Sequence, residues 1–258
     1  MLSRHRTETG VEWLVLNRPA ARNALSLEML TALEAALADI ATSDTRCVIL
    51  AAEGPVFSSG HDLKEMRAHR ADADGGRGFY TQAMAACARV MQAVVHLPQP
   101  VIAAVEGVAT AAGCQLVASC DLAVATPNAR FCTPGVDIGL FCSTPAVAIS
   151  RAIGRRAAMD MLLTGRMVEA EEARAMGLLN RVAADARATA LALAEGIAAR
   201  SQLTIRMGKA GFNAQAGCAL PEAYAQAAAV MVDNMMAEDA KEGIGAFLEK
   251  RAPQWQDK

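Results

Sequence analysis

Two short segments combine glycine with other small residues at the point where an apolar run gives way to a helical pattern. They read FSSGHDL, residues 57–63, and ATAAGCQL, residues 109–116. The first N–H groups of a helix have no acceptor within the helix, and small side chains allow a ligand to approach them. Such amides can bind an anion or stabilise an oxygen that becomes negative during a reaction.

The two segments are built alike, and each follows an apolar run that predicts a buried strand, Cys47–Ala52 and Val101–Val105. If these strands are neighbours in a sheet, the helix N-termini can converge, so that one N–H from each points at the same oxygen. That arrangement is a main-chain oxyanion hole, in which losing one donor costs about 3–4 kcal/mol of transition-state stabilisation. The alternatives are two ordinary strand–helix turns and, for the second segment, a site of tight helix–strand packing.

The rest of the chain predicts strands alternating with helices up to about residue 182, followed by helices only. Val11–Leu16 predicts a first strand, and Ser26 is a suitable N-cap for a helix that reaches Ile40. Residues 53–60 and 70–78 predict a loop and a flexible link. The other expected elements are helices at 61–66, 79–97, 144–153, 155–163 and 168–176, a strand at 178–182, and helices from 186 to about 249. This order indicates an α/β core with parallel strand pairs and a helical C-terminal part.

The composition excludes several classes of protein. The chain has 258 residues, of which 53% are hydrophobic and 4% aromatic, and its net charge is −2. These values indicate a large core and provide neither the basic patch nor the aromatic surface of a nucleic-acid binder. No apolar run approaches the ~18 residues of a membrane span. Seven scattered cysteines without zinc spacing, and a start without an apolar leader, predict a cytoplasmic protein without a metal site.

Six blocks of the chain together resemble the enoyl-CoA hydratase/isomerase (crotonase) superfamily over nearly its whole length. They are LNRPAARNALS, VILAAEGPVFSSGHDLKEM, PVIAAVEGVATAAGCQLVASCDLAVA, ARFCTPGVDIGL, AIGRRAAMDMLLTGRMVEAEEARAMGLLNRV and EGIGAFLEKRAP. The resemblance implies an α/β fold of the ClpP/crotonase type, with a spiral of repeated ββα units over residues 1–195. It also implies a helical region at 196–258 that forms trimers, often paired into hexamers. The implied ligand is an acyl-CoA thioester, with coenzyme A as part of the substrate and no other cofactor.

The same resemblance implies roles for individual residues. The N–H groups of His61 and Ala112 would form the oxyanion hole and hold the thioester carbonyl. The residues implied to contact coenzyme A or the acyl group are Arg22, Ala24, Gly60, Asp62, Leu63, Lys64 and Pro134. Phe247 and Lys250 match residues that approach coenzyme A, often from a neighbouring subunit. Lys64 could reach a phosphate, and a solvated lysine is the alternative.

The sequence departs from the hydratases of this family at both positions where they carry a glutamate, because Gln115 and Gly135 stand there. Hydration needs a base on the water and an acid for the α-carbon, and positioned proton transfer contributes about 10²–10⁴-fold to the rate. Gln115 has no titratable proton at a useful pH, although it can hydrogen-bond a water. Gly135 is expected to offer only space. One subgroup of the superfamily itself carries Gln and Gly at these positions.

Four other residues could take over a chemical role, and each has a structural alternative. His61 could titrate near neutrality, although a role of its N–H alone is favoured. Asp137 would face the same way as Gly135 if the segment is extended, although surface exposure is favoured. Cys142 could be a nucleophile, although lining the acyl pocket is favoured, and Glu106 is expected to make a buried structural hydrogen bond.

The sequence therefore predicts an enzyme of the hydratase/isomerase class that acts on enoyl-CoA thioesters in fatty-acid or related acyl-CoA metabolism. The alternatives are an acyl-CoA binder or regulatory protein without catalysis, and another acyl-CoA reaction such as hydrolysis, decarboxylation or isomerisation. The Met- and Ala-rich stretch at 227–236 favours a subunit interface over a ligand surface. We expect a homotrimer or hexamer, with neither a nucleic-acid nor a membrane partner.

Overall fold

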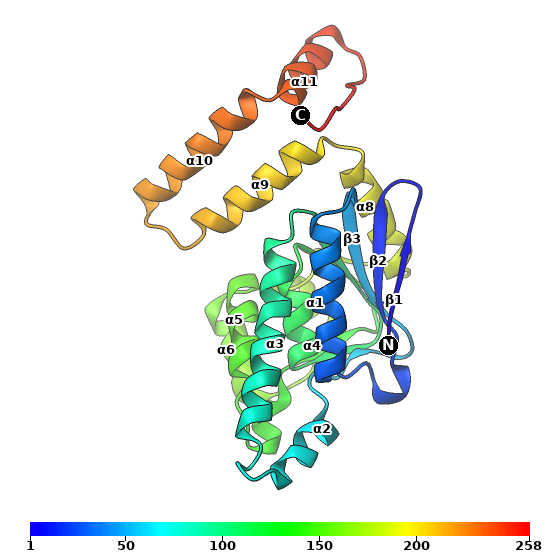
Figure 1. Ribbon diagram of the computed structural model, residues 1–258, viewed down its shortest axis with the longest axis vertical. Coiled ribbons are helices and arrows are strands. Elements are labelled where there is room, and N and C mark those ends of the chain that lie inside the picture. Colours follow the sequence, from blue (N-terminus) through cyan, green and yellow to red (C-terminus); the bar gives the residue numbers. More distant parts are fainter.

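A computed structural model describes residues 1–258 and contains two sheets (Figure 1). The larger sheet has the strand order β1-β2-β3-β5-β7-β10, and only the β1–β2 pair is antiparallel. Its strands are β1 (Leu2–Arg6), β2 (Val11–Leu16), β3 (Cys47–Ala52), β5 (Val101–Val105), β7 (Leu122–Ala125) and β10 (Arg181–Val182). The smaller sheet, β4-β6-β8-β9, consists of Val56–Ser58, Val108–Thr110, Arg130–Cys132 and Val168–Glu169.

Eleven α-helices cover the sheets and form the C-terminal part. They are α1 (Leu27–Ala41), α2 (Leu63–Ala68), α3 (Arg77–His96), α4 (Ala112–Ser119), α5 (Ser143–Ala152), α6 (Arg155–Thr164), α7 (Ala170–Met176), α8 (Ala186–Ala198), α9 (Gln202–Gln215), α10 (Leu220–Met235) and α11 (Glu238–Glu249). Three 3₁₀-helices, η1 (Pro19–Ala21), η2 (His69–Ala71) and η3 (Pro134–Ile138), lie in the connections. None of the helices combines the length and hydropathy that crossing a membrane requires.

The central strands are buried on both faces, because helices cover each side of the larger sheet. Successive side chains point to opposite faces, so alternate residues of β3 and β5 join two different cores. Val48 and Leu50 pack with residues of α1, α3 and α4. Ile49 and Ile102 pack against α8, which presents a row of alanines, Ala186, Ala190, Ala194 and Ala198. The predicted α/β core with parallel pairs is confirmed.

A ββα unit recurs along the chain. In the units β3-β4-α2 and β5-β6-α4, the first strand joins the larger sheet and the second joins the smaller one. The strands β7 and β8 repeat the same division and are followed by η3 and α5. Because equivalent strands are neighbours in each sheet, the segments that follow them lie close together at one end of the molecule.

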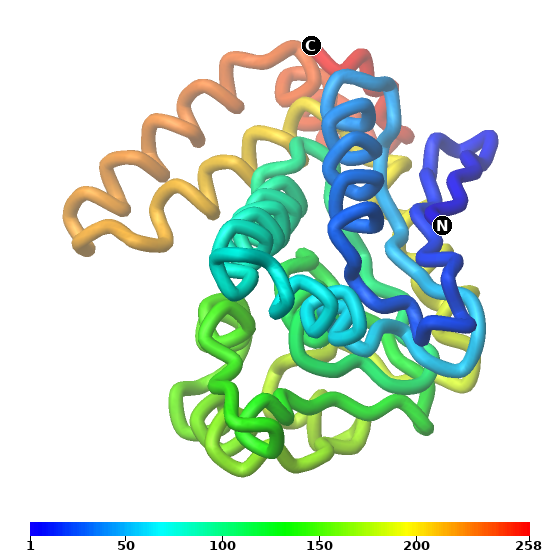
Figure 2. Tube along the Cα trace, turned by 60° about the horizontal axis from the view of Figure 1, so that its bottom comes forward, coloured from blue at the N-terminus to red at the C-terminus, as the bar shows by residue number.

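The C-terminal helices α9 and α10 form an antiparallel hairpin that projects from the core, as Figures 1 and 2 both show. Helix α10 has no buried residue. The domain boundary predicted between residues 195 and 196 falls within α8, which ends at Ala198 and packs on the larger sheet. The division of the chain into two regions stays a prediction.

Several short elements differ from the sequence-based expectation. The strand β4 lies inside the predicted loop at 53–60, and β1, β6, β7 and β8 were not expected. Residues 168–169 form a strand before α7, and the last strand covers only Arg181–Val182 of the expected 178–182. The link at 70–78 contains part of η2 and the start of α3. Strand β1 pairs with β2, which follows it directly in the chain. Strands β4 and β6 have only three residues each, and they form because a distant segment supplies the pairing, as between Val56 and Val108.

Candidate active site

The two small-residue turns meet, as the predicted strand pairing requires. Strand β3 pairs in parallel with β5, and β4 pairs in parallel with β6. A Cβ atom added to Gly60 would lie 3.0 Å from the Thr110 oxygen and 3.1 Å from the Ala112 nitrogen. One added to Gly113 would lie 2.4 Å from the Ser58 oxygen. The predicted convergence of the two turns is therefore confirmed, and only glycine allows their backbones to approach so closely.

The amides of His61 and Ala112 are available to a ligand at this contact. The Leu25 N–H binds the Gly60 carbonyl at 2.8 Å, but no main-chain hydrogen bond has the His61 N–H as its donor. Ala112 is the first residue of α4, so its N–H has no acceptor within the helix. Ala111, which precedes it, has φ 49° and ψ −118°, a conformation that costs about 1–3 kcal/mol for a residue with a side chain. The surrounding structure holds this strained turn in place.

Asn23 supports the first turn, and the sequence analysis missed it. It is wholly buried with φ 50°, and its side-chain oxygen accepts from the Arg18 N–H at 2.8 Å. Its amide nitrogen donates to the carbonyls of Glu53 and Val56, also at 2.8 Å. The Ser58 hydroxyl donates to the Asn23 carbonyl. The sequence feature that could have revealed Asn23 is its position in a turn that contains proline, because asparagine tolerates the left-handed conformation.

The residues implied to bind coenzyme A lie beside the first turn. Ala24 is buried, and the Ser59 N–H donates to the Arg22 carbonyl at 3.0 Å, which places this segment against the turn. The side chains of Arg22, Leu63 and Lys64 are exposed. Neither cation takes part in an ion pair, so both are free to meet phosphates. No group of three or more His, Cys, Asp or Glu side chains could hold a metal ion.

Asp62 has a structural role next to these residues. Its carboxylate caps α2 by accepting from the N–H groups of Lys64 and Glu65, and it pairs with Arg18 at 3.0 Å. Burial acts to raise the pKa of Asp62, but the N–H donors and the Arg18 guanidinium outweigh it and lower that pKa below its usual value. Asp62 therefore stays ionised and orients the helix that follows the first oxyanion donor.

The two C-terminal residues implied to approach coenzyme A lie far from these turns within one protomer. Phe247 lies on α11 and is 82% exposed, and Lys250 ends that helix with φ 57°. Figure 1 shows α11 and α2 at opposite ends of the molecule. A single chain therefore does not bring Phe247 and Lys250 to the predicted site.

Gln115 lies one helical turn beyond Ala112 and is only 4% exposed. Its side-chain oxygen faces the Cys87 thiol, with 4.0 Å between the oxygen and the sulfur. Its side-chain nitrogen donates no hydrogen bond to the protein. An amide in this place can orient a water or a ligand, but it cannot exchange a proton near neutral pH.

Gly135 does not leave the space that the sequence analysis expected. A Cβ atom added there would lie 2.9 Å from the Cys142 sulfur and 2.8 Å from the Leu140 oxygen. Cys142 is 8% exposed, and its sulfur occupies the space into which a longer side chain at position 135 would extend. Burial raises the pKa of Cys142, although the Gly135 main chain acts against this. The thiol is therefore neutral at pH 7, which agrees better with a lining role than with a nucleophile.

The favoured expectation for Asp137, surface exposure, is confirmed, whereas the expectation for Glu106 needs correction. Residues 134–138 form a 3₁₀-helix, so the extended geometry that would have aligned Asp137 with Gly135 is absent. Asp137 is exposed, and its carboxylate lies beside Gly165. Glu106 is not buried either, because it forms a half-exposed ion pair with Arg187 at 2.9 Å. Pro134 begins the 3₁₀-helix and is partly buried.

The His61 imidazole is enclosed without a partner. Neither ring nitrogen makes a hydrogen bond, and both are shielded from solvent. Burial lowers the pKa of His61, and the nearby Leu25 main chain offsets only part of this effect. The ring is therefore neutral at pH 7, so it offers one donor nitrogen and one acceptor nitrogen but no positive charge.

We expect the protein to lose stability as the pH falls below about 6.5, because the lowered pKa of His61 makes the unfolded chain bind a proton more readily. This contribution is fully present above pH 6.5 and is lost as the pH falls toward the folded-state pKa. The free energy of unfolding, measured in urea at pH 7.5 and 5.5, should fall less in His61→Leu than in the unmodified protein. His96→Leu, at an exposed histidine, is the control. Equal losses in the unmodified protein and His61→Leu would contradict the prediction.

Comparison with known proteins identifies the family to which this fold and these paired turns belong. Residues 6–258 match the enoyl-CoA hydratase/isomerase family, and the chain belongs to that family, with the crotonase fold. A crystal structure of an enoyl-CoA hydratase from Mycobacterium smegmatis is 50% identical, with a TM-score of 0.93 and 98% of each chain covered. The predicted fold and superfamily are confirmed.

The chain is also similar to proteins of a particular subgroup. The mitochondrial enoyl-CoA hydratase domain-containing protein 3 of Rattus norvegicus is 46% identical over 98% of this chain and 84% of its own length. The crystal structure of the human protein of that name is 45% identical, with a TM-score of 0.93, covering 98% of this chain and 99% of that one. A putative enoyl-CoA hydratase of Thermus thermophilus is 39% identical over 93% of this chain and 95% of its own.

Proposed function

We propose that the protein binds acyl-CoA thioesters and acts on enoyl-CoA in fatty-acid or related acyl-CoA metabolism. The observation that carries this proposal is the pair of free amides, His61 and Ala112, held together by a strained turn. A thioester carbonyl that accepts both hydrogen bonds becomes more polarised, and an enolate oxygen formed from it is stabilised. Free cations at Arg22 and Lys64, beside the first turn, match the phosphates of coenzyme A.

The side chains beyond the oxyanion hole favour a slow hydratase. Gln115, Gly135 and the neutral Cys142 thiol offer neither a base for water nor a strong acid for the α-carbon. What remains is binding, orientation and polarisation of the thioester. These steps serve isomerisation, hydrolysis or decarboxylation as well, provided that the substrate or water supplies the proton. The lack of a base for water and of an acid for the α-carbon also favours the second candidate, an acyl-CoA binder or regulatory protein without turnover.

Binding and turnover should be measured separately on the full chain. Calorimetry with butyryl-CoA, which cannot be hydrated, tests binding, and the loss of enoyl absorbance with crotonyl-CoA tests hydration. Binding together with turnover above the buffer rate supports the enzyme, whereas binding without it supports the alternative. Absence of binding for CoA esters of every chain length would refute both. Mass spectrometry of products from a panel of acyl-CoA esters would reveal a different reaction.

We also propose that the protein assembles into trimers or hexamers through its C-terminal helices. Helix α10 buries nothing in one protomer, and its exposed apolar side chains include Leu220, Tyr224, Met231, Val232 and Met235. Light scattering after gel filtration should give a mass three or six times that of the chain. Replacing Met231 and Met235 by glutamate should release smaller species, whereas Asp233→Lys, on the opposite side of α10, should not. A monodisperse monomer at micromolar concentration would overturn this proposal.

Contact between subunits offers a way for Phe247 and Lys250 to reach a site, because α11 lies far from α2 within one chain. For the cellular location we propose a reducing compartment, the cytoplasm, because all seven cysteines are free thiols. Several of the relatives carry the word mitochondrial in their names. Fractionation of cells that produce the protein, with antibody detection, distinguishes the two compartments.

A further inference from the structure

Ser58, the last residue of β4, is wholly buried between the two turns. Its hydroxyl donates to the Asn23 carbonyl at 2.9 Å and accepts from the Gly60 N–H at 3.3 Å. Neither of these main-chain groups has another hydrogen-bond partner. Because a buried main-chain group without a partner is disfavoured, loss of this hydroxyl would favour a shift of the Gly60 main chain.

The Gly60 main chain sets the direction of the first oxyanion donor. The peptide bond that joins Gly60 to His61 is planar and trans, so its C=O and its N–H point in opposite directions. The Leu25 N–H holds the Gly60 carbonyl at 2.8 Å, and the Ser58 hydroxyl holds the N–H of the same glycine. These two hydrogen bonds together fix the direction in which the His61 N–H points.

Ser58 also lies against the second turn, at the start of α4. A Cβ atom added to Gly113 would lie 2.4 Å from the Ser58 main-chain oxygen, 2.7 Å from its Cβ atom and 2.9 Å from its hydroxyl oxygen. Gly113 directly follows Ala112, whose N–H is the second predicted donor. One small side chain therefore touches the residue before the first donor and the residue after the second.

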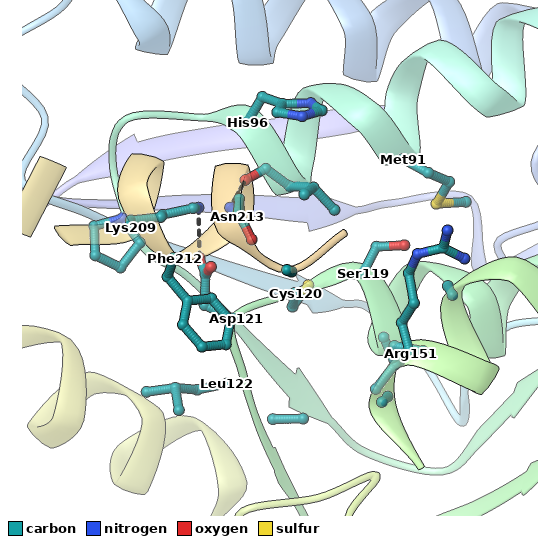
Figure 3. A pocket seen from close by; sticks show the side chains of 18 of the residues that line it. Met91, His96, Ser119, Cys120, Asp121, Leu122, Arg151, Lys209, Phe212 and Asn213 are labelled. Carbon is teal, nitrogen blue, oxygen red and sulfur yellow. Dashed lines mark hydrogen bonds and ion pairs between the residues drawn. The ribbon is translucent and has the colours of Figure 1, made fainter. Parts of the chain in front are cut away.

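The other end of α4 borders a cavity of about 1290 Å³ beside α9, and Figure 3 shows Ser119 at its wall. None of the residues 57–63 or 109–114 lines this cavity, so it does not reach the donors of the two turns. The Ser119 hydroxyl is buried and donates to the Gln115 carbonyl at 2.8 Å. Ser119 is therefore a matched control for Ser58, because both are buried serines that bind a main-chain carbonyl.

We propose that Ser58 is a positioning residue of the oxyanion hole, which keeps the two main-chain donors aimed at one oxygen. This inference rests on the proposed function, because that oxygen is the carbonyl of a bound thioester. The buried hydroxyl touches no ligand and transfers no proton, and it acts through the amides of His61 and Ala112. Hydrogen bonds to the carbonyl strengthen as its oxygen becomes negative, so misaligned donors cost more in the transition state than in binding.

The test is the infrared carbonyl stretch of butyryl-CoA, isotope-labelled at the thioester carbonyl and bound to the full-length protein. In the unmodified protein, two aligned donors should move this band to a lower frequency than in free butyryl-CoA. Ser58→Ala should lose roughly half of that shift, because one of the two donors is misaligned. It should weaken butyryl-CoA binding by less than about tenfold, the value of one hydrogen bond. Ser119→Ala should leave the shift unchanged.

Ser58→Cys is the second variant, because a thiol fills the same place but is only a weak donor and acceptor. Its shift should lie between those of the unmodified protein and Ser58→Ala, and it decides the question if Ser58→Ala does not fold. A full shift in the folded variant, or equal losses in Ser58→Ala and Ser119→Ala, would overturn the role of Ser58. Absence of butyryl-CoA binding, or of any shift in the unmodified protein, would instead refute the proposed function and this inference with it.

Discussion

Hydration of crotonyl-CoA is expected to rise by about 10²-fold or more when glutamate replaces Gln115 and Gly135 and Cys142 is shortened to alanine. The two glutamates would supply the base and the acid that the present side chains lack. The change at Cys142 is required because a Cβ atom at position 135 would lie 2.9 Å from its sulfur. The measurement is the loss of enoyl absorbance at matched protein concentration.

The double variant that keeps Cys142 is the informative control. It should gain less activity and unfold more easily than the triple variant, since overpacking of this kind costs about 1–3 kcal/mol. The Leu140 carbonyl, 2.8 Å from the same Cβ position, lies in an exposed loop and must shift in both variants. A triple variant that folds and binds butyryl-CoA but hydrates no faster than the unmodified protein would show that the oxyanion hole is not placed for this reaction.

Replacing Gly60 by alanine is expected to reduce turnover by about 10²–10³-fold, the cost of losing one oxyanion donor. Gly60 has φ 80°, which disfavours any residue with a side chain. Its new methyl group would press on the Thr110 oxygen, the Ala111 methyl and the Ala112 nitrogen, all at 3.0–3.1 Å. The turns would have to separate, and the His61 and Ala112 amides would no longer point at one oxygen.

This effect should be measured where activity is highest, in the triple variant, and as butyryl-CoA affinity in the unmodified protein. Gly154→Ala is the matched control, because φ there is −62° and nothing lies within 4 Å of the added atom. Far-UV circular dichroism would show whether both variants fold. If Gly60→Ala folds and retains both turnover and affinity, the two turns do not form the site.

The local sequence decided the parts of this protein that depend on short-range periodicity and on single residue types. The runs Cys47–Ala52 and Val101–Val105 form strands with the predicted bounds, because continuous apolar stretches are stable only when buried on both faces. Ser26 caps α1, accepting from the Met29 N–H at 3.3 Å. The prediction of two glycine turns that converge also needed only local patterns and one assumption about strand order.

Elements that depend on distant partners could not be read in the same way. Strand β4 has three residues, and it exists because β6, about fifty residues later, pairs with it. Asn23 could be recognised as a turn residue, but its three 2.8 Å hydrogen bonds reach Arg18, Glu53 and Val56. The sequence left open whether Asp137 faces the same way as Gly135, and only the structure shows that this segment closes into a 3₁₀-helix instead of extending.

The site shows the same division. The sequence by itself indicated two small-residue turns that can present free amides, which the family resemblance assigned to His61 and Ala112, and it determined that Gln115 and Gly135 cannot exchange protons. Only the tertiary structure decided that the Cys142 thiol fills the volume beside Gly135, and that the His61 ring is enclosed without a hydrogen-bond partner. The physical reason is that the ability of a side chain to exchange a proton depends first on its own residue type, which the sequence states. Occupied volume and the enclosure of a side chain depend on residues that folding brings together from separate helices and strands.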